Sequence, residues 1–361
     1  MRETLDQLVR ALVASGGRSI RPAARLMTLL EDEPERLPEL FRAVSAMGGL
    51  EAGGRGTAAL SRLQPRLLVG VTGAPGSGKS TLVDALIREY RRRWPDRRLG
   101  VIAVDPSSPF TGGAVLGDRV RMMRHATDPM VFVRSVASRG HLGGLSLGVK
   151  GIVHVLGLAG CDAVFLETVG VGQSEVEVAR VADLVLIVLA PGQGDSVQLL
   201  KAGLMEVGDL FVVNKADRPD AERLLGQLLA TLRLDDLSDD EGHHAPGADD
   251  RAAQVAGQPR PADAGENVLL ASAADGRGVG AIVDRVEALA LRDRDRWIAR
   301  REAAIATEVR EAVIEAATRR IEEVLGDETA ARQLAGRVID GAATIEEVAD
   351  RLICRAAKSG T

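Results

Sequence analysis

Short apolar runs recur through the middle of the chain, and longer segments with helical spacing separate them. Seven such runs follow one another: LLVGVTG, LGVIAVD, MVFVRS, CDAVFLET, ADLVLIVLA, DLFVVNKA and NVLLASA. Because these runs are almost continuously apolar, without the alternation of a half-exposed strand, they are typical of strands buried on both faces. The pattern predicts an α/β fold with a mainly parallel sheet of about seven strands, flanked by helices.

Helical periodicity dominates both ends of the chain. Leu5, Leu8 and Leu12 recur at helical spacing near the start, and a similar pattern returns from Trp297 to Leu325. We therefore expect an N-terminal helical extension, a sheet domain, and a C-terminal helical arm that packs on the sheet domain or on a second copy of the chain. The expected boundaries are residues 1–62, 63–291 and 292–361, with a flexible acidic insertion at 235–265 inside the sheet domain.

The charge balance and the rarity of aromatic residues argue against nucleic-acid binding. Lys and Arg number 46 against 51 Asp and Glu, a net charge of −5, so no positive excess is available to neutralise a phosphate backbone. Two Trp, one Tyr and five Phe are too few for base-stacking platforms. The longest apolar run, Leu184 to Ala190, is far shorter than the roughly 20 residues that cross a bilayer. We expect a cytoplasmic protein that binds neither nucleic acid nor membrane.

A phosphate-binding loop follows the first predicted strand. Residues 73–81 read GAPGSGKST, which satisfies G-x-x-x-x-G-K-[ST] in the strand, loop and helix context that the motif needs. The glycines let successive N–H groups turn toward the α and β phosphates, while Lys79 reaches the β and γ phosphates and the Ser80 hydroxyl binds Mg²⁺. A simple turn would need neither the lysine nor the hydroxyl. The predicted nucleotide-binding residues here are Gly73, Ala74, Pro75, Gly76, Ser77, Gly78, Lys79, Ser80 and Thr81.

A second motif, Asn214-Lys215-Ala216-Asp217, indicates which base is bound. A carboxylate at Asp217 can accept hydrogen bonds from both N1–H and the 2-amino group of guanine. Adenine offers no such pair of donors, and sites of this kind discriminate by roughly 10⁴ to 10⁵. We expect Asn214 to bridge the base edge and the phosphate loop, the Lys215 stem to lie along the ring, and a backbone N–H of Ser272-Ala273 to reach the 6-oxo group. The alternative is a strand-to-helix turn capped by Asp217.

Acidic residues end two further predicted strands. Glu167 ends the strand CDAVFLE, where a carboxylate can orient Mg²⁺-bound water, and Gly170 follows with an N–H that can approach the γ phosphate. Asp105 ends the second strand, and Asp118 follows in the same glycine-containing segment. Two carboxylates beside a nucleotide and metal suit a segment that becomes ordered when the γ phosphate is present. The plainer alternative makes Asp105 a turn residue and Asp118 a helix cap.

Taken together, these segments resemble one group of nucleotide hydrolases. GAPGSGKST, VDPSSPFTGGAVLGDRVRM, ETVGVGQSE, LAPGQGDSVQLLKAG and NKAD are similar to the MeaB (also called ArgK) subfamily of P-loop GTPases, which has glutamate in the Walker B position. The resemblance covers about residues 1–361. The phosphate loop is common to many families, whereas the segment from Asp105 to Met122 and ETVGVGQSE are specific to this one.

The resemblance implies a GTPase that uses GTP, GDP and Mg²⁺. The residues that would surround the metal are Ser80, Asp105, Asp118 and Glu167. The residues that would act in catalysis are Lys79, Glu167 and Asp105.

It also implies a homodimer and a chaperone of adenosylcobalamin-dependent methylmalonyl-CoA mutase, because members of the subfamily gate cofactor delivery to that mutase and guard it against inactivation. Residues Pro191–Gly203, with Gln193, Asp195 and Lys201, would correspond to the family's extra mobile switch. The family often shows a glycine run where Gln193 stands, and the acidic stretch 235–265 is longer than usual.

Two other functions fit parts of the pattern. A kinase of a transport-system binding protein would need an acceptor side chain and a base, and no His or Asp is arranged for that role. A non-catalytic module would hold GTP only to present an interface. The residue that aligns the attacking water is not evident either. Gln173 lies three residues after Gly170, and Arg119, Arg121 and Arg124 suit a solvated helix face as well as a catalytic role.

The histidines and cysteines carry weaker signals. His243-His244 could bind a transition metal, but no cysteine accompanies the pair and the surrounding composition is typical of disorder. Cys161 opens an apolar strand, which favours a core residue over a nucleophile. The two cysteines lie far apart in the sequence, so neither a disulfide framework nor a cysteine-based zinc site is predicted.

Overall fold

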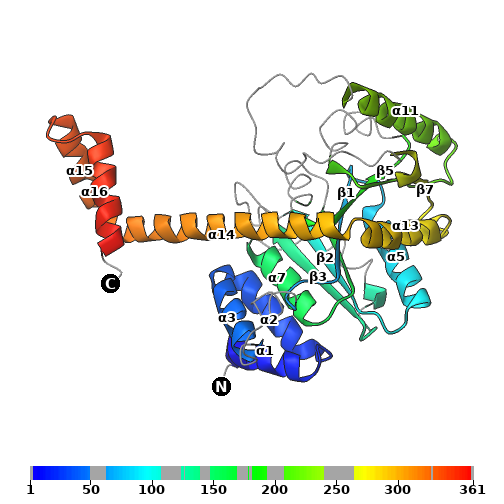
Figure 1. Ribbon diagram of the computed structural model, residues 1–361, viewed down its shortest axis with the longest axis horizontal. Coiled ribbons are helices and arrows are strands. Elements are labelled where there is room, and N and C mark those ends of the chain that lie inside the picture. Colours follow the sequence, from blue (N-terminus) through cyan, green and yellow to red (C-terminus); the bar gives the residue numbers. More distant parts are fainter. Residues whose placement is uncertain are drawn as a thin grey trace. The chain divides into compact units, whose positions relative to one another are not determined.

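The computed structural model describes residues 3–48, 62–106, 123–125, 127–138, 147–168, 178, 181–192, 207–239, 264–326 and 328–358. The chain divides into two compact units, residues 1–300 and 301–361. The first unit holds a single sheet with helices on both faces (Figure 1), and the second consists of helices.

All seven predicted strands are present, and they pair in parallel in the order β3-β2-β4-β1-β5-β6-β7. Their bounds are β1 Leu67–Thr72, β2 Leu99–Pro106, β3 Val131–Ser138, β4 Ala163–Thr168, β5 Leu184–Leu189, β6 Leu210–Val213 and β7 Val268–Leu270. β1 lies in the middle, with β2, β3 and β4 on one side and β5, β6 and β7 on the other. This arrangement makes the carboxyl end of β1 a topological switch point, where open α/β sheets bind their ligands.

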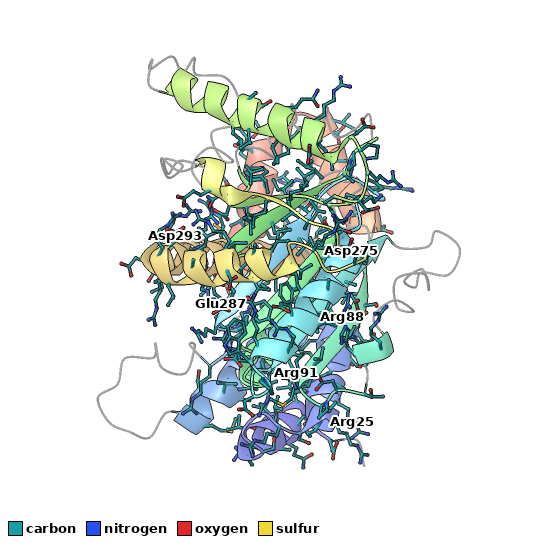
Figure 2. The ribbon with its side chains drawn as sticks, turned by 90° about the vertical axis from the view of Figure 1, so that its right-hand side faces the viewer. Arg25, Arg88, Arg91, Asp275, Glu287 and Asp293 are labelled. Atoms are coloured by element: carbon teal, nitrogen blue, oxygen red, sulfur yellow. The ribbon has the colours of Figure 1, made fainter. Side chains whose placement is uncertain are left out.

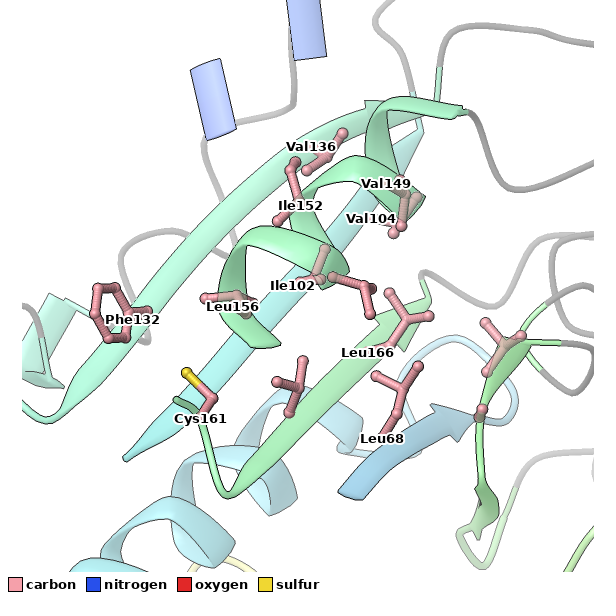
Figure 3. Close-up of a cluster of buried hydrophobic side chains, with 14 of the residues drawn as sticks. Leu68, Ile102, Val104, Phe132, Val136, Val149, Ile152, Leu156, Cys161 and Leu166 are labelled. Carbon is pink, nitrogen blue, oxygen red and sulfur yellow. The ribbon is translucent and has the colours of Figure 1, made fainter. Parts of the chain in front are cut away.

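Alternate residues of each strand enter two separate hydrophobic cores. On β4, Phe165 packs under α5 (Lys79–Arg93) and α13 (Val279–Arg292), the face that Figure 2 shows. Its neighbours Val164 and Leu166 belong to the opposite core, under α7 (Leu147–Leu158) and α11 (Ala221–Asp239) (Figure 3). This period of two explains the sequence pattern, since a strand covered on both faces needs apolar residues at every position.

The N-terminal helices join the core on the α7 face. They are α1 Leu5–Ala14, α2 Ile20–Asp32, the 3₁₀ turn η1 Pro34–Arg36 and α3 Leu37–Gly48. Thr4 and Gln7 form a capping box at the start of α1, in which each side chain accepts a hydrogen bond from the other residue's amide. α2 packs along α7, and Glu31 pairs with Arg134 of β3. The helical periodicity of this part of the sequence therefore reflects burial against the sheet domain.

Helix α14, Arg294–Leu325, begins in the first unit and continues into the second. Within the first unit, Trp297 is buried in the core beneath α13, and Arg296 and Arg300 pair with Asp209 just before β6. The second unit contains the rest of α14 together with α15 (Glu328–Ile339) and α16 (Ile345–Lys358). The expected C-terminal helices are thus present.

The first residues of the predicted acidic insertion belong to a helix. Residues 235–239 are helical because α11, held by buried Leu228 and Leu232, continues as far as Asp239. Two short 3₁₀ turns complete the described elements: η2 at Met123–His125 and η3 at Ala264–Asn267. No helix in the described ranges has both the length and the apolar character needed to cross a membrane.

Candidate functional site

The predicted phosphate loop lies at the carboxyl end of β1 and leads directly into α5, which begins at Lys79. Two of its glycines are required by close contacts. A Cβ on Gly73, whose φ is 141°, would lie 2.1 Å from the Val188 carbonyl oxygen. A Cβ on Gly78, whose φ is 92°, would lie 2.4 Å from the Asn214 side-chain nitrogen. Only glycine fits such positions, so the loop can pass closely over the strand ends.

The Lys79 side chain folds back over this loop. Its ammonium group donates hydrogen bonds to the carbonyl oxygens of Gly73, at 2.8 Å, and Ala74, at 3.0 Å. The lysine is buried, so a positive charge stands at the mouth of the loop beside the N-terminus of α5. Positive charge and a helix N-terminus together form a favourable place for a phosphate group.

Ser80 and Glu167 meet beside the lysine. Glu167 belongs to the set of β4 positions that face α5, and its Oε1 accepts a 2.5 Å hydrogen bond from the Ser80 hydroxyl. Both residues are buried. A hydroxyl and a carboxylate are hard oxygen donors of the kind that Mg²⁺ prefers, so these two residues fit the predicted metal.

The other predicted metal ligands are described less fully. The backbone of Asp105 lies in β2, two residues beyond Ala103, which is the register partner of Glu167. Asp118 and Gly170 lie outside the described residues, as do Gln173, Gln193, Asp195 and Lys201. In the described ranges, no group of three or more His, Cys, Asp and Glu side chains is placed to hold a metal ion. The pair His243-His244 also lies outside these ranges.

Asn214 joins the phosphate loop to the loop after β7. Its backbone N–H donates a hydrogen bond to the carbonyl oxygen of Leu189, the last residue of β5. Its side-chain amide donates to the Ser77 carbonyl oxygen at 2.9 Å and accepts from the Ala273 N–H at 3.1 Å. The ends of β1, β6 and β7 are therefore connected through one buried side chain.

Lys215 and Asp217 follow Asn214 in the chain and lie nearer the protein surface. Lys215 adopts a φ of 60°, which is rare for a residue with a side chain, and its ammonium group donates to the Gly76 carbonyl oxygen at 2.6 Å. The Ser272 hydroxyl donates to Asp217 Oδ1 at 3.2 Å. Asp217 is exposed, so its second carboxylate oxygen can meet a ligand that enters from solvent.

A polar pair that was not evident from the sequence lies beside this site. Asp84 of α5 is buried, and its Oδ1 lies 2.8 Å from Nε2 of His125, which is also buried. A charged residue within the buried stretch TLVDALI was the available signal, since an ionised side chain in such a place needs a partner. Its partner could not be named because His125 is 41 positions away.

Comparison with known proteins gives one family and several relatives. A family model described as methylmalonyl-CoA mutase-associated GTPase MeaB matches residues 56–325. A Pyrococcus abyssi protein, named provisionally as a GTPase, is 47% identical over 231 residues, which are 64% of this chain and 65% of that protein. The GTPase ArgK of Escherichia coli is 50% identical over 155 residues, 42% of this chain and 45% of its own. The chain thus matches less than two thirds of the length of either relative.

A solved structure extends the likeness over the whole chain. The crystal structure of an LAO/AO transport system kinase covers 98% of this chain, and the likeness covers 97% of that chain, with a TM-score of 0.56. The sequence identity is 24%, so this comparison supports the fold and nothing further.

Proposed function

Since the chain belongs to the MeaB family of methylmalonyl-CoA mutase-associated GTPases, we propose that it hydrolyses GTP to GDP and phosphate with Mg²⁺. We further propose that it acts as a chaperone of adenosylcobalamin-dependent methylmalonyl-CoA mutase, gating cofactor loading and protecting the mutase.

A single observation supports the nucleotide part of this proposal. Asn214 ties the phosphate loop at Ser77 to the loop at Ala273, while Ser272 holds Asp217 beside them. A phosphate cradle and a carboxylate suited to the guanine edge are therefore parts of one connected site. A phosphate loop alone would serve many nucleotides, whereas the added acid favours guanine.

The chain's own residues would divide the work of hydrolysis between them. The Lys79 ammonium group exchanges its carbonyl contacts for the β and γ phosphate oxygens, and the amides at the start of α5 bind the same charge. Ser80 and Glu167 would hold Mg²⁺, together with Asp105 and Asp118. When bound, Mg²⁺ would neutralise the negative charge that develops on the phosphate oxygens. These groups lower the barrier by positioning and electrostatics, without a covalent intermediate.

We assign the partner functions to other parts of the chain. Residues 191–203 are the proposed extra switch, and the C-terminal arm is the proposed seam of a homodimer. We propose that basal hydrolysis is weak and rises when the mutase orders the switches, since catalysis of this type depends on exact positioning.

The decisive experiment measures phosphate release from GTP by the purified chain with Mg²⁺, alone and with saturating mutase. We expect slow turnover alone and at least roughly tenfold faster turnover with the mutase, since one well-placed hydrogen-bond donor can change the rate by about 10²–10³. The Lys79→Ala variant is the control and should lose nucleotide binding or turnover.

Each contrary outcome would count against a different part of the proposed function. Equal rates with and without the mutase would refute the partner role. Stable transfer of label from GTP to a second protein would favour a kinase. Tight GTP binding with no phosphate release, even in the complex, would favour a non-catalytic binding module.

A further inference from the structure

A buried acid–histidine pair lies one helical turn beyond the proposed metal ligand Ser80. Asp84 follows Ser80 by four residues on α5, so both side chains lie on the same face of the helix. Asp84 is 4% exposed and His125 is 7% exposed, and Asp84 Oδ1 lies 2.8 Å from His125 Nε2. Because a carboxylate only accepts, the contact places a proton on Nε2 of the imidazole.

Two arginines complete the surroundings of the carboxylate. Arg124 Nε lies 3.2 Å from Oδ1, and Arg88 Nε lies 3.4 Å from Oδ2. Both guanidinium groups reach in from solvent, with side chains 59% and 49% exposed. Contacts of such exposed groups are weak, so the buried imidazole is the partner that fixes the geometry.

A second contact holds the same stretch of chain against α5. Arg91, seven residues after Asp84, donates to Asp128 Oδ2 at 2.8 Å. The Asp128 N–H in turn donates to the His125 carbonyl oxygen, and its carbonyl oxygen accepts from the Val131 N–H at the start of β3. Figure 2 shows Arg88 and Arg91 following one another along α5. His125 and Asp128 are thus tied to the helix that begins at the phosphate loop at two points about two turns apart.

We propose that His125 is a positioning residue for the metal site: through Asp84 it holds the first turns of α5 so that Ser80 faces Glu167. The inference rests on the proposed Mg²⁺-dependent GTPase. Ser80 and Asp84 belong to consecutive turns of one rigid helix, so a shift at Asp84 moves the Ser80 hydroxyl relative to Glu167, its 2.5 Å partner on a separate strand. Binding of phosphate by the loop amides depends less on this alignment than metal binding does, because the metal needs both oxygens in place.

The test compares variants that differ in one hydrogen-bond donor. In His125→Gln the side-chain amide nitrogen can take the place of Nε2. In His125→Asn the side chain is too short for its amide nitrogen to reach Asp84. The matched control is His154→Ala, because His154 is also buried, at 3% exposed, but lies in α7 against Phe41. Two quantities are measured with a fluorescent GDP analogue: its affinity in EDTA, and the Mg²⁺ concentration that half-maximally slows its release.

We expect His125→Ala and His125→Asn to raise this Mg²⁺ concentration about tenfold, while the affinity in EDTA changes less than threefold. His125→Gln should recover most of the wild-type value. His154→Ala should leave the Mg²⁺ dependence unchanged even where it lowers the melting temperature.

A loss of thermal stability in His125→Ala with an unchanged Mg²⁺ dependence would overturn the inference, as would equal effects of the Gln and Asn variants. If the wild-type chain itself binds no guanine nucleotide, or shows no Mg²⁺ effect, the proposed function fails first and the inference with it. If the alanine variant does not fold, the comparison of Gln with Asn decides.

Discussion

At the scale of single residues, Asn214 shows how much one side chain can organise. Its amide donates to one loop and accepts from another, and both contacts are buried. An amide is suited to this position because it is donor and acceptor at once, whereas an acid could only accept. An alanine here would remove a hydrogen bond from both the Ser77 carbonyl oxygen and the Ala273 N–H.

We propose that a preference for guanine depends on Asp217. In Asp217→Asn the amide nitrogen can donate to the 2-oxo group of xanthine but repels the 2-amino group of guanine, while its oxygen can still accept from N1–H. We expect GDP affinity to fall roughly 100-fold or more and XDP affinity to exceed it, since such sites reject a mismatched edge strongly. Calorimetry with the two diphosphates measures this, and an unchanged preference for GDP would contradict the base assignment.

The two cysteines should differ sharply in reactivity. Burial raises the pKa of the Cys161 thiol to about 12, so almost none of it is thiolate at neutral pH, whereas Cys354 is exposed. We expect a thiol reagent to modify one group per native chain, and none in Cys354→Ser. Labelling of Cys161 in the folded protein would show that the segment just before β4 opens readily.

At the scale of secondary structure, α5 connects the site to the rest of the first unit. Its first turn belongs to the proposed phosphate site, its middle contacts His125 through Asp84, and its end pairs with α13 through Arg93 and Asp284. Glu89 orients this last contact, since it accepts from Arg92 and Arg93. Hydrogen bonds from Arg92 and then Arg93 lower the pKa of Glu89 to about 2.

This lowered pKa makes part of the stability depend on pH. A carboxyl that titrates lower in the folded than in the unfolded chain stabilises the fold above its unfolded pKa, near 4.5, and the gain is lost as pH falls toward 2. We expect Glu89→Gln to lower the free energy of unfolding by about 0.5–1 kcal/mol at pH 7 and by less at pH 3.5. Urea unfolding at both values checks this, and a constant difference would contradict it.

The elements themselves were largely predictable from the sequence. Largely apolar runs predicted each strand, because burial on both faces of a parallel sheet leaves few polar positions in a strand interior. The edge strand β3, which carries Arg134 and Ser135, is the exception. The phosphate loop was evident because its glycines and lysine are local in sequence. The order of the strands and the contact of Asp84 with His125 were not evident, since both depend on residues brought together from distant parts of the chain.

At the scale of the whole molecule, the change of unit after Arg300 differs from the expected start of the arm at residue 292. Residues 293–300 belong to the first unit. Trp297 is 5% exposed, and Arg296 and Arg300 pair with Asp209. We therefore propose that the sheet domain includes the first turns of α14.

Two shortened chains test this proposal. A chain that ends at Arg300 keeps Trp297 and both arginines, so it should keep the wild-type melting temperature and bind GTP as a monomer. A chain that ends at Arg292 loses the buried indole, which costs about 3–5 kcal/mol and lowers the melting temperature by roughly 10 °C. Equal stability of the two would contradict the proposed boundary, and a dimer of the longer one would contradict the proposed dimer seam.

The bridge made by Asn214 has one more consequence. Since the proposed phosphate loop and the proposed base-binding corner are joined through Asn214, the distance between them is set before any ligand arrives. We expect guanosine alone or pyrophosphate alone to contact one end of the site and bind weakly, and a molecule that joins them at the right length to gain both contacts for a single loss of translational freedom.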